Sequence, residues 1–173
     1  MTAQIANGGY KIKPKIIVNN NPLTVEEAKK AMELQSLKSP NTKLFNDKKN
    51  IKIIQEAMFS STNERYGTSY RSRIDDPKYQ FAGKTGTAQV KRIIKREREL
   101  DLKLEDIPYN DRDHALYVAY GPYKKPRYAL SIIVEHGGSG SKAAAPMAKE
   151  LFKLIIDRNE VRNKQSNFEE LDI

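Results

Sequence analysis

Apolar residues along the chain recur with two different spacings, one typical of helices and the other of strands. Spacings of three and four positions predict helices over residues 22–37, 50–63 and 141–157, and a short helix before Asn7 that the following glycines end. In the helix over 141–157, the pattern predicts that three side chains face the core: Leu151, Leu154 and Ile155.

Alternation of apolar and polar residues predicts three strands, over residues 80–90, 115–120 and 128–135. The last two strands flank a short segment containing Gly-Pro, which predicts an antiparallel hairpin. Helices before and after these strands indicate an α+β fold, with an antiparallel sheet flanked by helices. Four tyrosines fit half-buried packing positions better than a base-stacking surface: Tyr117, Tyr120, Tyr123 and Tyr128.

Composition narrows the classes of function without choosing one. The chain has 173 residues, of which 38% are hydrophobic, and this suits a single domain or a large part of one. The net charge of +9 is compatible with nucleic acid, an anionic membrane surface or an anionic polymer as partner. The absence of cysteine and the presence of only two histidines argue against a metal site, and no motif indicates a cofactor. The sequence contains no apolar run of about 18 residues that would form a membrane anchor.

Two segments are unusually rich in charge. Residues 91–110 mix basic and acidic side chains, which predicts a solvated surface arm rather than a nucleic-acid patch. Residues 158–173 are also charged and are predicted to form a mobile tail.

The predicted strand over 80–90 contains the sequence FAGKTGTAQV, which places a lysine and two threonines among small residues. A phosphate-binding loop of the Walker A type needs a glycine at position 78, which is Lys78, so nucleotide binding loses its main support. The lysine and threonines among small residues fit an accessible strand better. A peptide can pair with the edge of such a strand. Lys84 would then attract a carboxylate, the Thr85 hydroxyl would donate a hydrogen bond to it, and a free backbone N–H would stabilise an oxyanion.

The Lys-Thr-Gly-Thr-Ala run at residues 84–88 resembles the third motif of the penicillin-binding proteins and serine β-lactamases. The segments ANGG, KPKII, FAGKTGTAQV and VEHGGSGSKAAAP follow one another as in the C-terminal part of the transpeptidase domain of class B penicillin-binding proteins, in the penicillin-binding protein 2 group. The similarity extends over about residues 1–156. Residues 1–157 are therefore identified as the C-terminal part of such a transpeptidase domain.

The resemblance implies a function in cell-wall elongation. A serine would attack the penultimate D-Ala of a peptidoglycan stem peptide, and a second stem's amine would resolve the acyl-enzyme. It assigns Lys84 a catalytic, electrostatic role, and Thr85, Gly86 and Thr87 the binding of substrate, with the Thr87 N–H as half of the oxyanion hole. The implied partners are stem peptides ending in D-Ala-D-Ala, β-lactams and the elongation machinery, but not nucleic acid. The implied location is the periplasmic face of the bacterial inner membrane.

The family's Ser-x-x-Lys nucleophile motif and its Ser-x-Asn motif are expected before residue 1. Two similar runs occur, Ser61-Thr62-Asn63 and Ser139-Gly140-Ser141-Lys142. We interpret the first as an ordinary helix end and the second as a loop in which Ser141 caps the final helix, because the second follows Lys-Thr-Gly in the wrong order. The chain is thus expected to lack the nucleophile, to be inactive alone, and to need the N-terminal half of the domain, which would supply two further strands.

Two other classes of function stay open at this point. The chain could be a basic nucleotide- or nucleic-acid-binding domain, or a catalytically dead interaction module that keeps the fold. The two histidines do not decide between them, since His136 is predicted to hold a strand end and His114 to form a hydrogen bond at a strand start.

Overall fold

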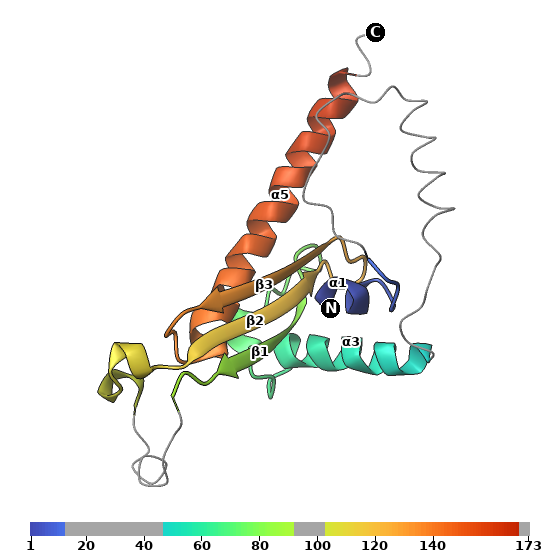
Figure 1. Ribbon diagram of the computed structural model, residues 1–173. Helices are drawn as coiled ribbons and strands as arrows, with labels where there is room; N and C mark the ends of the chain where they lie inside the picture. Colours follow the sequence, from blue (N-terminus) through green and yellow to red (C-terminus); the bar gives the residue numbers. More distant parts are fainter. Residues whose placement is uncertain (13–46, 92–102, 170–173) are drawn as a thin grey trace.

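The computed structural model describes residues 1–12, 47–91 and 103–169, and its elements are arranged as in Figure 1. The predicted helix over 22–37 and most of the charged arm lie outside these residues. The helices are α1 (Thr2–Ala6), α3 (Lys48–Asn63) and α5 (Ala145–Glu169), and the strands are β1 (Ala82–Ala88), β2 (His114–Gly121) and β3 (Tyr128–Val134). Short helical turns are η1 (Tyr70–Ser72), η2 (Leu104–Asp106), η3 (Tyr109–Asp111) and η4 (Gly140–Ala144).

The three strands form one antiparallel sheet in the order β1-β2-β3. Thr85 of β1 lies opposite Tyr117 of β2, which lies opposite Ile132 of β3, so these side chains share one face. The hairpin between β2 and β3 is confirmed, and its turn contains the cis peptide bond between Gly121 and Pro122. The α+β class predicted from the sequence is therefore confirmed.

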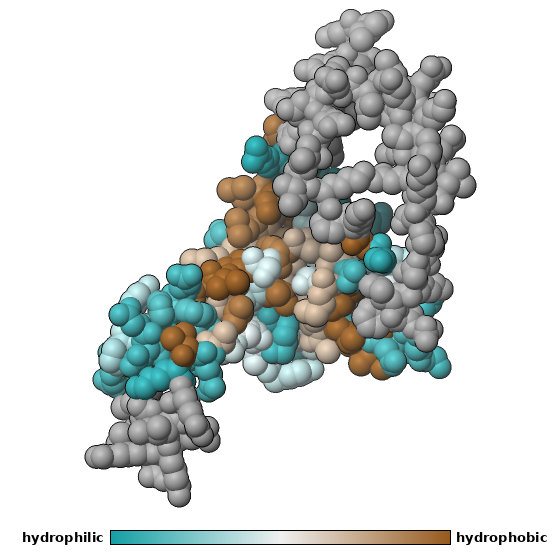
Figure 2. Space-filling model, viewed as in Figure 1, coloured by the Kyte–Doolittle hydropathy of each residue, from teal (hydrophilic) through white to brown (hydrophobic). Residues whose placement is uncertain are grey.

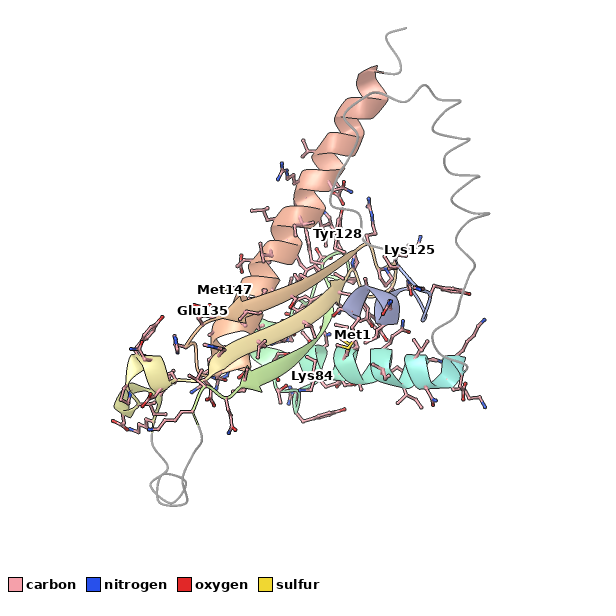
Figure 3. All side chains as sticks on the ribbon, in the orientation of Figure 1. Met1, Lys84, Lys125, Tyr128, Glu135 and Met147 are labelled. Carbon is pink, nitrogen blue, oxygen red and sulfur yellow. The ribbon has the colours of Figure 1, made fainter. Side chains whose placement is uncertain are left out.

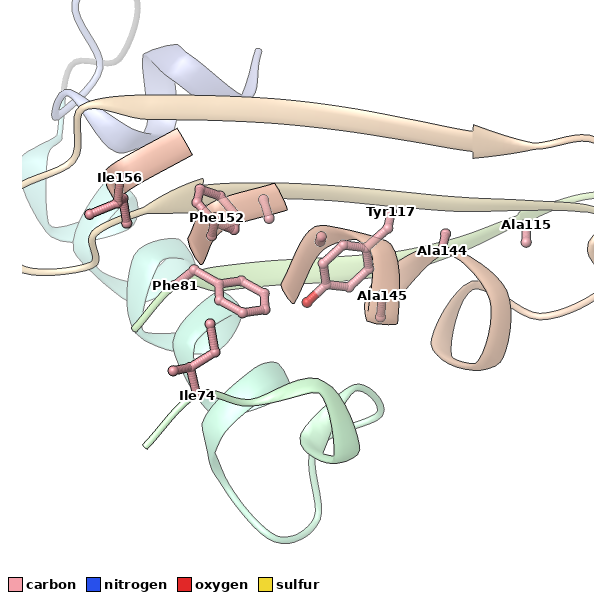
Figure 4. Close-up of a cluster of buried hydrophobic side chains, with 10 residues drawn as sticks. Ile74, Phe81, Ala115, Tyr117, Ala144, Ala145, Phe152 and Ile156 are labelled. Atoms are coloured by element: carbon pink, nitrogen blue, oxygen red, sulfur yellow. The ribbon is translucent and has the colours of Figure 1, made fainter. Parts of the chain in front are cut away.

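The main core lies between the sheet and α5, as Figure 4 shows. Phe152 stacks on Phe81 with ring centroids 4.9 Å apart. The side chains of α5 buried in this core are Ala145, Ala148, Phe152 and Ile156.

The inward face of α5 differs from the prediction. Leu151 is 41% exposed and Leu154 is 60% exposed, while Ile155 is half-buried. The helix is rotated by about one residue because the small Ala145 and Ala148 side chains face the sheet and allow a close approach, with Phe152 filling the space beyond them.

The opposite face of the sheet carries a second, smaller core. Met58 of α3 packs there with Ala82 and Tyr120, and Ile5 of α1 contacts the same cluster. The predicted helix over 50–63 is thus confirmed, and α1 ends before Gly8, where a positive φ of 85° suits glycine.

The start of the C-terminal helix also differs from the prediction. Ser139 is the N-cap of η4, and its carbonyl accepts from the amides of Lys142 and Ala143. Ser141 therefore lies inside a π-helical turn and is not an N-cap. The helix then runs to Glu169, past residue 157, while the mobility of residues 158–173 stays a prediction.

Polarity is unevenly distributed over the visible surface. Figure 2 shows mainly hydrophilic residues around η2 and η3, and more hydrophobic ones over the sheet and α5. Among the described helices, none combines the length and the apolar character needed to cross a bilayer.

Candidate functional site

The outer edge of β1 presents backbone groups in a fixed alternation. The amide of Gly83 donates to Thr62 Oγ1 at 3.1 Å, so it points away from β2. Because successive residues of a strand direct their N–H and C=O groups to opposite edges, those of Thr85 and Thr87 point the same way as those of Gly83. Within the part of the chain that the structure describes, β1 is an edge strand. A peptide in extended conformation can pair with such an edge.

Lys84 and Thr85 meet at this edge although their side chains leave the strand on opposite sides. Lys84 Nζ lies 2.9 Å from the Thr85 carbonyl oxygen and 3.4 Å from Thr85 Oγ1, because the flexible lysine stem folds back. Lys84 and Thr87 are exposed, and Thr85 and Gly86 are half-buried. Figure 3 shows Lys84 beside β1, well apart from Lys125 in the hairpin turn. The structure thus places a cation, a hydroxyl and outward backbone groups on one edge.

A buried group of three hydroxyls supports the edge from inside. The Tyr117 hydroxyl lies 2.9 Å from Thr62 Oγ1 and 3.0 Å from Ser69 Oγ. Ser69 Oγ in turn donates to the carbonyl of Ser61 at 3.0 Å. Burial raises the pKa of Tyr117, although the bonds to Ser69 and Thr62 oppose that shift, so the phenol stays neutral at ordinary pH. Through Thr62, this group ties the last turn of α3 to the amide of Gly83.

Two glycines allow close approaches at the site. An added Cβ at Gly83 would overlap the Tyr117 hydroxyl and would lie 2.5 Å from Cζ of that ring. An added Cβ at Gly140 would overlap the carbonyl of Leu116 and would lie 2.8 Å from the carbonyl oxygen of Gly86. Turn η4 therefore rests directly on the backbone of β1 and β2.

The two serine motifs that resemble catalytic ones have other contacts. In the first run, Thr62 holds Gly83, and Asn63 Nδ2 donates to the carbonyl of Phe81 at 2.9 Å. In the second run, Ser139 Oγ lies 3.0 Å from Ser141 Oγ at the start of η4. These contacts give both runs structural partners, although Ser141 is not the helix cap predicted from the sequence, and the absence of a catalytic role stays a prediction.

Both histidines hold the end of the sheet, in agreement with the interpretation from sequence. The amide of His136 donates to His114 Nδ1 at 3.0 Å. His136 Nδ1 lies 3.0 Å from the carbonyl oxygen of Arg112, which can only accept, so this ring nitrogen carries the proton. Within the described ranges, His, Asp and Glu form no group of three that could hold a metal ion.

Sequence reasoning found the strand but missed its supporting residues. The sequence predicts Tyr117 only as a packing residue and Thr62 only as part of a helix end, and no pattern in it points to Thr68 or Ser69. Hydroxyl side chains are common at helix ends and in loops, so their types carry no signal of a buried network. Only the fold shows that these residues converge on β1.

Comparison with known proteins shows to which family the chain belongs. Residues 1–153 match the family described as penicillin binding protein transpeptidase domain. The chain belongs to this family. Penicillin-binding transpeptidase relatives include the peptidoglycan D,D-transpeptidase MrdA of Acinetobacter baumannii, 34% identical over 96% of this chain and 23% of the relative. MrdA of Haemophilus influenzae is 30% identical over 83% of this chain and 22% of the relative.

Solved structures of the same group share the fold. A complex between PBP2 and MreC from Helicobacter pylori matches 88% of this chain and 23% of that chain, with a TM-score of 0.57 and 30% identity. Pseudomonas aeruginosa PBP2 in complex with WCK 5153 matches 88% of this chain and 28% of that chain, with a TM-score of 0.58 and 27% identity. The predicted resemblance to the C-terminal part of a penicillin-binding protein 2 transpeptidase domain is confirmed. The chain spans less than a quarter of the length of the MrdA relatives that it matches.

Proposed function

We propose that this chain supplies the substrate-binding strand of a peptidoglycan D,D-transpeptidase that acts in cell-wall elongation. The observation that carries the proposal is the outer edge of β1, where Lys84 and Thr85 meet beside outward backbone groups. Membership of the penicillin-binding transpeptidase family supports it. The ligands would be stem peptides ending in D-Ala-D-Ala, and β-lactams that resemble them.

In this proposal the ligand lies along β1 as an added strand. Lys84 attracts its terminal carboxylate, and the hydroxyls of Thr85 and Thr87 donate to it. Gly86 leaves the backbone uncovered, so the ligand can approach. The N–H of Thr87 donates to the carbonyl oxygen that becomes negative in the tetrahedral intermediate, as half of an oxyanion hole.

The covalent step needs a serine that we place outside residues 1–173. Its hydroxyl would attack the penultimate D-Ala carbonyl, expel the terminal D-Ala and form an acyl-enzyme, which the amine of a second stem would resolve. We place this reaction on the periplasmic face of the bacterial inner membrane, with the elongation machinery as partner. The Helicobacter pylori complex of PBP2 with MreC supports that choice of partner.

A titration tests the proposal on the chain as it is. N-acetyl-D-Ala-D-Ala is added to the ¹⁵N-labelled chain, and the dissociation constant is read from the amide shifts of Thr85 and Thr87. Lys84→Ala should weaken binding about tenfold or more, because it removes a charge-assisted contact of about 1.5–3 kcal/mol. Lys125→Ala, an exposed lysine in the hairpin turn, is the matched control and should leave the constant unchanged.

Three results would contradict the proposal. Shifts that avoid β1 would place the ligand elsewhere, and equal effects of Lys84→Ala and Lys125→Ala would remove the specific role of Lys84. A folded chain that binds no D-Ala-D-Ala peptide would favour a catalytically dead interaction module.

A further inference from the structure

Three hydroxyls form a row on the surface beside β1. Thr68 Oγ1, in the loop after α3, lies 3.2 Å from Thr85 Oγ1 and 3.2 Å from Ser61 Oγ. Lys84 Nζ lies at the other end of the row, 3.4 Å from Thr85 Oγ1. Thr68 therefore contacts the hydroxyl to which the proposed function assigns the ligand carboxylate.

A bound carboxylate would fix the direction of the hydrogen bond between Thr68 and Thr85. An ammonium group only donates, so Thr85 Oγ1 accepts from Lys84, and it can either donate to Thr68 or accept from it. A carboxylate only accepts, so Thr85 must turn its proton toward a bound carboxylate. Thr68 must then be the donor to Thr85 Oγ1 if the bond between the two hydroxyls is to persist. A side chain without a hydroxyl at position 68 cannot donate this bond.

The backbone on both sides of Thr68 is held against the end of α3. The amide of Gly67 donates to the carbonyl of Glu64 at 2.8 Å, and the amide of Ser69 donates to the carbonyl of Ser61 at 3.0 Å. The Ser69 side chain is also fixed in the buried hydroxyl group with Tyr117. Thr68 is exposed, but its position relative to β1 is set by these neighbours.

We propose that Thr68 is a positioning residue that gives the site its preference for a free carboxylate, by donating to Thr85 when the ligand is bound. The inference rests on the proposed function and adds a residue to it. Thr68 does not contact the ligand and acts only through the Thr85 hydroxyl. Its removal should weaken binding of ligands that end in a carboxylate and leave uncharged ones nearly unaffected.

The test compares N-acetyl-D-Ala-D-Ala with its C-terminal amide, each titrated into the full chain. The wild-type chain should bind the acid more tightly than the amide. Thr68→Val should lower that preference about two- to tenfold, the range expected for one hydrogen bond. Thr68→Ser keeps the hydroxyl and should keep the preference. In a Thr85→Val background, Thr68→Val should have no further effect, because the group through which it acts is gone.

The outcomes separate this inference from the proposed function. If Lys84→Ala weakens binding of the acid but Thr68→Val leaves the acid-to-amide ratio unchanged, Thr68 is a bystander and the proposed function stands. If Thr68→Val weakens acid and amide equally, its role is structural and the inference is wrong. If the acid and the amide bind equally to the wild-type chain and Lys84→Ala changes neither, the proposed function fails together with the inference.

Discussion

Tyr117, in the middle of β2, and Thr62, in the last turn of α3, share a hydrogen bond of 2.9 Å inside the protein. The amide of Gly83 can only donate and the carbonyl of Ser61 can only accept, and these groups lie at the two ends of the buried row. Thr62 Oγ1 accepts from the amide of Gly83 and also lies 3.4 Å from the carbonyl of Met58, to which it can donate. The strand that carries Lys84 is thus fixed to a helix end by a connected group of buried hydrogen bonds.

Tyr117→Phe should destabilise the chain by about 1–3 kcal/mol, because it leaves the buried hydroxyls of Thr62 and Ser69 without one of their partners. Urea denaturation followed by circular dichroism measures the change. The matched control is Tyr66→Phe, since Tyr66 is 82% exposed and its loss of a hydroxyl should change stability by less than about 0.5 kcal/mol. Equal stability of the two variants would show that the buried group of three hydroxyls contributes little to the free energy of unfolding.

Gly83→Ala should destabilise the chain by about 1–3 kcal/mol, because the new methyl group overlaps the Tyr117 hydroxyl. Part of the loss should be recovered in the Gly83→Ala, Tyr117→Phe double variant, where the hydroxyl is absent, and part should remain because ring atoms Cζ and Cε1 still lie 2.5 and 2.7 Å from the added Cβ. Gly86→Ala is the control in the same strand, since its nearest contact would be Leu116 Cβ at 3.4 Å. Thermal denaturation of the four variants measures these losses, and strictly additive losses would refute a clash with the Tyr117 hydroxyl.

Features set by residues close together in the sequence could be predicted, and features set by contacts between distant residues could not. The strand around Lys84 and the hairpin were predictable, because alternation and turn residues are local signals. The inward face of α5 was predicted one residue away from its true position. Leucine is more hydrophobic than alanine, so the pattern favoured the leucines. The burial of Ala145 and Ala148 results from their close approach to the sheet, which the helix pattern alone does not show. The contacts of Thr62 and Thr68 could not be predicted from the sequence, because they join residues that only the fold brings together.

Asp157→Asn should lower stability slightly at neutral pH and not at acid pH. Tyr79 donates to Asp157 at 2.6 Å and Lys78 pairs with it at 3.0 Å, and these bonds hold the pKa of Asp157 below its ordinary value of 3.8. A depressed pKa gives stability that is present above pH 3.8 and is lost as the pH falls through the folded-state pKa. The group is exposed, so the effect is small.

The measurement for Asp157→Asn is the urea midpoint between pH 2 and pH 7, with Glu135→Gln as an exposed control. The difference between the wild-type chain and Asp157→Asn should narrow below pH 3.8. A difference that stays constant down to pH 2 would mean that ionisation of Asp157 has no part in it.

Incubation of the chain with a fluorescent penicillin should give no covalent label on the denatured protein. The prediction rests on the structural contacts of Ser61 and Ser139, whose hydroxyls bond to neighbouring hydroxyls. A complete penicillin-binding protein serves as the positive control for the reagent. Labelling that disappears in Ser139→Ala or Ser61→Ala would identify that serine as a nucleophile and overturn our interpretation.

The contact of Gly140 with the backbone of Gly86 joins two stretches that are distant in sequence. Gly140 is not among the residues that the proposed function assigns to the ligand. Yet a bulkier residue there would push on the strand from behind and displace the groups of Thr85 and Thr87 that face the ligand. Under the proposed function, a change at position 140 would therefore weaken ligand binding although it replaces none of the residues assigned to the ligand.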